Sequence, residues 1–157
     1  MKLSFAAPLT AMTLLASALF TSIPAMADVP GAHPAYVHGV RDLRIARGLL
    51  RGSEMPNVSR EEALARRDVD RAMNDAYNAS AIDQKNMRTP VSLDVNLNEH
   101  DRLVRAFVAL RAAHRDFTEF ESDGGALGWR HAAVVEVDRA AAHVRRALRA
   151  RNWDARY

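Results

Sequence analysis

The sequence predicts an all-α protein, an antiparallel four-helix bundle preceded by a cleavable signal peptide. Two observations lead to this prediction. In four separate segments the apolar residues recur every three or four positions, which is the spacing of one face of an α-helix. No segment alternates apolar and polar residues as a half-buried strand does. Amphipathic helices with short connections are typical of bundles, so we expect one domain over residues 28–157.

Residues 1–27 have the features of a signal peptide. Lys2 gives a positive start, Leu9–Phe20 is mostly apolar, and Ala25-Met26-Ala27 has the small-x-small cleavage pattern. The apolar run is too short for a membrane-spanning helix, which needs about 20 residues, and no later segment is long and apolar enough. We therefore expect export to the periplasm or the medium. The abundance of arginine and alanine favours a Gram-negative bacterium as the source.

The first two expected helices form a hairpin over about residues 34–87. Pro34 suits the first turn of a helix, because the N–H that proline lacks has no partner there. The pattern that follows predicts a helix ending near Gly52. Ser59 and Glu62 have the spacing of a capping box, which predicts that the second helix begins at Ser59 and runs to about Lys85.

The other two expected helices form a second hairpin over about residues 97–152, joined to the first by the linker Met87–Asn96. Asn96 or Asn98 is the expected cap of the third helix. The glycines after Ser122 are expected to end that helix, and the fourth helix is expected to begin near Trp129.

The two hairpins share short sequence matches. Leu-Arg-x-Ala occurs at residues 43–46 and again at residues 110–113, and Val-Asp-Arg-Ala occurs at residues 69–72 and again at residues 137–140. The second copies follow the first in the same order at nearly the same offset. This agreement predicts a duplicated helical hairpin.

The matched segments also suggest ion pairs between helices. Because the Val and Ala of Val-Asp-Arg-Ala face the core, Asp70 and Asp138 are expected at its edge. Arg44 and Arg111 hold corresponding places on the partner helices. We therefore predict that Arg44 pairs with Asp70 and that Arg111 pairs with Asp138, which would set the register of the helices.

Histidines raise the alternative of a metal-binding bundle. His38 and Asp42 lie four residues apart on one face of the first helix, and His114 lies on the apolar stripe of the third. These three residues are the candidate ligands of a divalent transition metal such as copper, nickel or zinc. Neither hairpin contains the Glu-x-x-His pair of carboxylate-bridged bundle sites. A structural role for the histidines, with no cofactor, is the simpler interpretation.

Enzymatic activity and nucleic-acid binding have little support. The chain has no Cys, no Gly-x-Ser-x-Gly motif and no phosphate-binding glycine loop. We therefore favour a non-catalytic role in binding or in the cell envelope, and an exported protein is not expected to meet nucleic acid. The partner is left open. The last helix carries arginines that are candidates for contact with anionic envelope surfaces, although cations are also favourable at a helix C-terminus. They are Arg145, Arg146, Arg149 and Arg151.

The start of the first helix resembles a pattern of uncharacterised exported bacterial proteins, His-Pro-x-Tyr-Leu-His-Ala-Leu-x-Asp-Leu-Arg-x-Ala-Arg. The matching residues are His33, Pro34, Tyr36, His38, Asp42, Leu43, Arg44, Ala46 and Arg47, and Gly39-Val40 replaces Ala-Leu. The resemblance implies a small helical exported protein without a known activity. A weaker likeness to small periplasmic metal-binding bundles rich in His and Ala implies the metal alternative.

Overall fold

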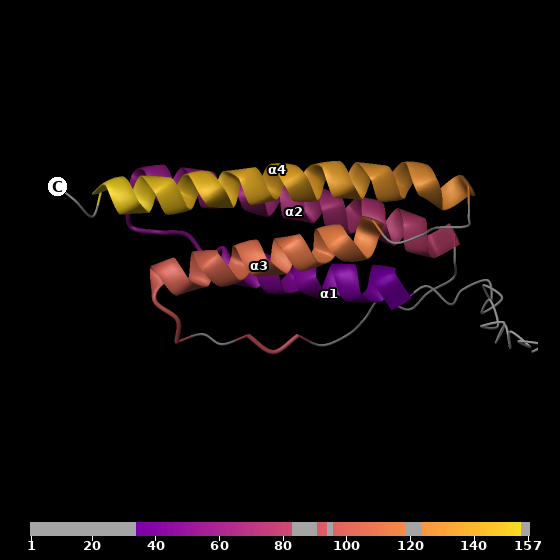
Figure 1. The fold of residues 1–157 in the computed structure, drawn as a ribbon, viewed down its shortest axis with the longest axis horizontal. Helices are drawn as coiled ribbons and strands as arrows, with labels where there is room; N and C mark the ends of the chain where they lie inside the picture. The colour runs from indigo at the N-terminus through magenta and orange to yellow at the C-terminus, as the bar shows by residue number, and fades with distance from the viewer. Residues whose placement is uncertain (1–33, 83–90, 94–95, 119–123, 155–157) are drawn as a thin grey trace, which may run out of the picture.

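The computed structural model describes residues 34–82, 91–93, 96–118 and 124–154. Four helices account for most of them: α1 (Pro34–Leu49), α2 (Pro56–Ile82), α3 (Glu99–Thr118) and α4 (Gly124–Asp154) (Figure 1). No strand occurs in these described ranges. The predicted all-α four-helix bundle is confirmed, while the predicted signal peptide lies outside the described residues.

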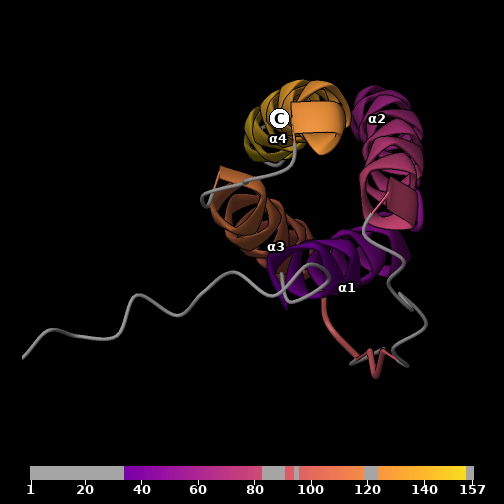
Figure 2. The same ribbon diagram turned by 90° about the vertical axis from the view of Figure 1, so that its right-hand side faces the viewer.

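Seen along its axis, the bundle has the order α1, α2, α4, α3 around the core (Figure 2). Each helix runs antiparallel to both of its neighbours, whereas α2 and α3 lie diagonally and run in the same direction (Figures 1 and 2). Because α2 ends at one end of the bundle and α3 begins at the other, the chain has to cross the length of the bundle between them. The connection from α2 to α3 is therefore not the short loop of a simple up-and-down bundle.

Helix packing is closest between α1 and α3 and between α2 and α4. The two helices within each expected hairpin, α1 with α2 and α3 with α4, pack against each other less extensively. Corresponding helices of the two expected hairpins thus lie side by side. The predicted duplication is compatible with this arrangement and stays a prediction.

The α1·α3 seam consists of large and small side chains in alternation. Phe117 at the end of α3 lies against Tyr36 at the start of α1, with 6.3 Å between the ring centroids. Its ring also occupies the space where a Cβ of Gly39 would lie, so this close approach requires glycine. On the α1 side the buried residues are Tyr36, Gly39, Leu43, Ala46 and, just after the helix, Leu50. On α3 they are Leu103, Ala106, Leu110, Ala113 and Phe117.

The α2·α4 seam is built from small side chains repeated every seven residues. The series is Val58, Ala65, Ala72 and Ala79 on α2 and Ala126, Ala133, Ala140 and Ala147 on α4, all fully buried. A seven-residue repeat keeps one face of each helix towards its partner. Alanine at these positions lets the two backbones approach closely, in agreement with the extensive contact between these helices.

Three helix ends test the predicted boundaries. Asn98 caps α3 as predicted, because its side-chain oxygen accepts the N–H of Asp101 at 2.9 Å. The capping box at Ser59 is wrong: α2 already begins at Pro56, and the N–H of Ser59 donates to the carbonyl of Met55, the residue before the helix, at 2.8 Å. Gly124 does not end α3 but begins α4, earlier than Trp129.

Candidate functional site

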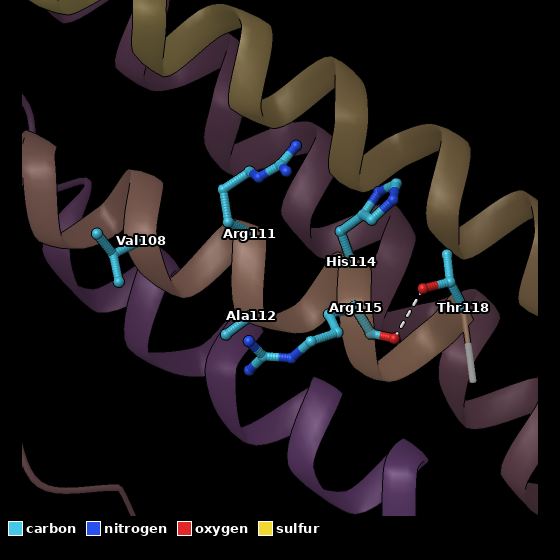
Figure 3. A pocket seen from close by; sticks show the side chains of 6 residues that line it. All are labelled: Val108, Arg111, Ala112, His114, Arg115 and Thr118. Carbon is cyan, nitrogen blue, oxygen red and sulfur yellow. Dashed lines mark hydrogen bonds between the residues drawn. The ribbon is translucent and has the colours of Figure 1, made fainter.

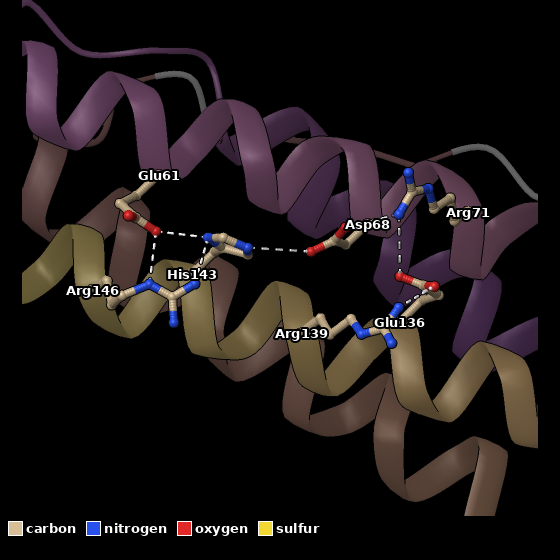
Figure 4. Close-up of polar contacts among 7 residues, drawn as sticks. All are labelled: Glu61, Asp68, Arg71, Glu136, Arg139, His143 and Arg146. Atoms are coloured by element: carbon tan, nitrogen blue, oxygen red, sulfur yellow. Dashed lines mark hydrogen bonds and ion pairs between the residues drawn. The ribbon is translucent and has the colours of Figure 1, made fainter.

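Charged side chains form a ladder across the margin of the α2·α4 seam (Figure 4). At its centre is His143 of α4, whose Nδ1 lies 2.6 Å from Oε2 of Glu61 on α2. On the other side of the ring, Nε2 lies 3.6 Å from Oδ2 of Asp68, also on α2. Arg146 donates to the same oxygen of Glu61 from its Nε at 2.9 Å. Both nitrogens of the imidazole thus face carboxylates of the neighbouring helix.

The ladder continues towards the start of α4. Arg71 of α2 lies 3.7 Å from Asp68 and 4.0 Å from Glu136 of α4. Arg139 donates to Glu136 at 2.8 Å. Since more than half of each arginine side chain is exposed, each of these pairs contributes at most about 1 kcal/mol. The ladder therefore contributes mainly to the alignment of α2 and α4, while the alanines of the seam allow the two backbones to approach closely.

The pKa values of two carboxyl groups on α2 are shifted in opposite directions. Burial tends to raise the pKa of Glu61, but hydrogen bonds from His143 and Arg146 outweigh it and hold the pKa below its ordinary value. The pKa of Asp75 is raised, first by burial and then by the like charge of Glu136. One carboxylate is thus stabilised by α4 and the other is opposed by it.

A buried ion pair closes the end of the bundle where α2 begins. Nη1 of Arg102 on α3 lies 2.6 Å from Oε1 of Glu62 on α2, and both side chains are almost fully buried. The same guanidinium donates to the carbonyl of Leu49 and, at 3.0 Å, to that of Gly52. It thereby donates to the carbonyl of the last residue of α1, which has no partner within the helix, and to a carbonyl three residues beyond it.

Burial raises the pKa of Glu62, and the neighbouring Arg102 opposes this rise. The sequence contained a signal for this buried position. Glu62 precedes Val69 by seven residues and so lies on the same buried side of α2 as that valine, although we interpreted Glu62 as a capping residue. The arrangement supports a structural role, because the pair fills the end of the core.

The predicted partners of Asp70 and Asp138 need correction. Asp70 pairs with Arg47 at 2.5 Å, and Asp138 lies 2.9 Å from Nδ1 of His114. Each partner lies one turn further along its helix than the predicted Arg44 and Arg111. Side chains lean towards the N-terminus of their helix, so a residue one turn later reaches the level of the carboxylate.

Arg44 and Arg111, the two arginines predicted as partners, have other surroundings. Arg44 donates from Nη2 to the hydroxyl of Tyr77 at 2.8 Å, which joins α1 to α2. Arg111 lines an open hollow on α3.

The predicted metal ligands do not converge in the structure. His38 is exposed on α1, Asp42 is half-buried on the same helix, and His114 faces Asp138 on α4. Burial raises the pKa of Asp42, and the charges of Arg41, His38 and Arg115 oppose this rise. Within the part of the chain that the structure describes, no three His, Asp or Glu side chains are grouped to hold a metal ion.

The hollow on α3 has a volume of about 500 Å³ and opens to the surface (Figure 3). All its lining residues belong to α3: Val108, Arg111, Ala112, His114, Arg115 and Thr118. Figure 3 shows Arg111 and His114 directed towards α4 and Arg115 on the side of α1. Val108 beside them is 61% exposed. This surface combines guanidinium groups with exposed valine.

The four candidate arginines of the last helix are divided by the fold. Arg146 is held by Glu61, and Nε of Arg151 lies 3.5 Å from Oε1 of Glu99. The guanidinium of Arg145 lies over the ring of Phe107 on α3, 5.8 Å from its centroid. Arg149 is exposed. Half of the predicted basic patch is therefore neutralised by carboxylates of other helices.

Carboxylates and arginines are distributed unequally between the seams and the surface. Ion pairs between helices engage Glu61, Glu62, Asp68, Asp70, Glu99, Glu136 and Asp138. By contrast, Arg66, Arg67, Arg111, Arg115 and Arg149 are exposed and form no ion pair within the described part of the chain. Within the described ranges, seven carboxylates thus take part in ion pairs between helices, while these five exposed arginines take part in none.

None of the helices in the described ranges is both long and apolar enough to cross a bilayer. In comparisons with protein-family models, with curated proteins and with solved structures, no match to this chain was found.

Proposed function

We propose that this protein is exported and acts as a non-catalytic binding protein that attaches to the anionic lipid surface of the cell envelope. The observation that supports this proposal is the set of exposed arginines that form no ion pair within the described ranges, above all Arg111 and Arg115 on α3. An arginine near a membrane that contains anionic lipid contributes about 1 kcal/mol to binding. A few such residues acting together give reversible attachment without a membrane span.

Among the basic surfaces, the face of α3 is the best suited to lipid. Arg111 and Arg115 lie beside Val108, and Val104 one turn earlier is 38% exposed. The basic outer face of α2 contains Arg66 and Arg67 together with the carboxylate of Asp70 and no exposed large apolar side chain. A lipid surface offers phosphate groups to the arginines and an apolar boundary to the valines.

Binding to vesicles tests the proposed partner. Vesicles of phosphatidylcholine with phosphatidylglycerol are expected to sediment the protein, whereas vesicles of phosphatidylcholine alone are not, and added salt is expected to weaken the binding. The double variant Arg111→Gln, Arg115→Gln is expected to lose about tenfold or more in affinity. Binding to polygalacturonate without binding to the vesicles would assign the partner to polysaccharide and contradict the lipid proposal.

The matched control is Arg66→Gln, Arg67→Gln, which removes the same charge from α2. We expect it to retain most of the affinity. If both double variants lose affinity equally, the α3 face is not the contact surface and only general basicity operates. Export is tested separately by N-terminal sequencing of protein from the periplasm of an expressing Gram-negative host, where the expected first residue is Asp28.

A further inference from the structure

We infer that the outer face of α2 is a second binding surface, which takes an acidic polysaccharide. This face consists of the exposed positions of the helix, and the charged residues at these positions are all arginines: Arg60, Arg66, Arg67 and Arg71. Among the described side chains of α2, the remaining exposed positions carry only proline, asparagine and alanine. The outer face of α2 is therefore both basic and hydrophilic.

The carboxylates of α2 offset little of this charge, because neighbouring helices engage them. His143 of α4 contacts both Glu61 and Asp68, at 2.6 Å and 3.6 Å. Arg102 of α3 pairs with the buried Glu62. These carboxylates lie on the sides of α2 that face the rest of the bundle, and the arginines of the outer face lie on the side that faces solvent.

A hollow of about 380 Å³ lies on this face, and its lining residues are Ala63, Arg66, Arg67, Asp70, Arg71 and Asn74. The carboxylate in the hollow, Asp70, is about half exposed and is already paired with Arg47 of α1 at 2.5 Å. Arg66 and Arg67 form no ion pair within the described part of the chain. Their guanidinium groups can therefore pair with the anionic groups of a ligand.

The chemistry of the face fits a polymer of acidic sugars. The planar fork of a guanidinium group matches the two oxygens of a carboxylate. The side-chain amide of Asn74 can both donate to and accept from sugar hydroxyls. Unlike the α3 face with Val104 and Val108, the described outer face of α2 offers no large apolar side chain to a lipid boundary. A hydrated polyanion therefore suits α2 better than a lipid surface does.

The arrangement of the bundle separates the two basic faces. Because α2 and α3 lie diagonally across the core, the outer face of α2 points away from the α3 face that contains Arg111 and Arg115 (Figure 2). Occupation of one face thus leaves the other accessible. The binding of polysaccharide to α2 does not depend on the proposed lipid attachment.

Fluorescence anisotropy of labelled polygalacturonate, with the purified protein at low ionic strength, tests the α2 face. The wild type is expected to bind, and added salt is expected to weaken the binding. Arg66→Gln, Arg67→Gln is expected to lose about tenfold in affinity. The matched control Arg111→Gln, Arg115→Gln removes the same charge from α3 and is expected to retain most of the affinity for polygalacturonate.

Three results would overturn the inference: no binding of polygalacturonate to the wild type, equal losses in the two double variants, or equally tight binding of labelled dextran, which is uncharged. Loss of vesicle binding by Arg66→Gln, Arg67→Gln with polygalacturonate binding unchanged would assign the α2 face to lipid and would also overturn it. Absence of vesicle binding together with the expected polygalacturonate results would support the α2 site and contradict only the proposed lipid attachment.

Discussion

The α1·α3 and α2·α4 seams of this bundle are stabilised in different ways. The first is short and contains large side chains that alternate with small ones, with Phe117 packed against Tyr36 and over Gly39. The second joins the two longest helices through alanine and valine, and charged side chains line its margin. The first seam therefore depends on filled volume. The second depends on close backbone approach and on alignment by charges.

Removing volume should be most damaging in the α1·α3 seam. Phe117 is 1% exposed, so Phe117→Ala is expected to lower the free energy of unfolding by about 3–5 kcal/mol through lost burial and a cavity. Chemical denaturation measures this loss. The control Val108→Ala, on the exposed side of the same helix, is expected to change stability by about 0.5 kcal/mol or less. Equal effects of the two variants would show that Phe117 does not fill the seam.

Adding volume should be the more informative change in the α2·α4 seam. Ala140 is fully buried in the alanine series of α4, and Ala140→Leu is expected to cost about 1–3 kcal/mol because the helices are forced apart. Ala63→Leu places the same side chain on the exposed face of α2 and is expected to be nearly neutral. If Ala140→Leu stabilised the protein, the seam would contain free space and the contrast with α1·α3 would fail.

The smallest expected effect concerns the charges at the margin of α2·α4. Because burial and Glu136 raise the pKa of Asp75 above the unfolded value of 3.8, ionised Asp75 opposes folding. Asp75→Asn is therefore expected to raise the unfolding temperature by about 1 °C at pH 7, with the gain disappearing as the pH falls to about 3.8 or below. Thermal unfolding across this pH range checks the sign. A gain that persisted in acid would point to a cause other than charge.

Local signals predicted the helices and one of the caps correctly. The cap of α3 involves Asn98 and Asp101, only three residues apart, so the sequence contains the whole interaction. The capping box failed because its glutamate, Glu62, is occupied by Arg102, which lies far away in the chain. A residue whose spacing fits a local capping interaction can instead form a stronger interaction with a residue that is distant in the sequence.

The candidate site was predicted only in part, for a geometric reason. Asp70 and Asp138 were expected at the edge of the core, and the structure places both in ion pairs between helices. Which residues become their partners, Arg47 and His114, depends on how far one helix is shifted along its axis relative to the other. The spacing of apolar residues within either helix does not specify this shift. The environment of His143 likewise depends on residues of α2 that are more than seventy positions away.

By itself, the sequence determined that this protein is helical, where most of its helices lie and which faces they bury, because these properties follow from the spacing of apolar residues along each segment. Only the tertiary structure decided which helices pair, that α2 and α3 run in the same direction, and which carboxylates form ion pairs between helices. These features depend on contacts between distant parts of the chain. The spacing of residues within one helix specifies neither the distance between two helices nor their relative position along the bundle axis.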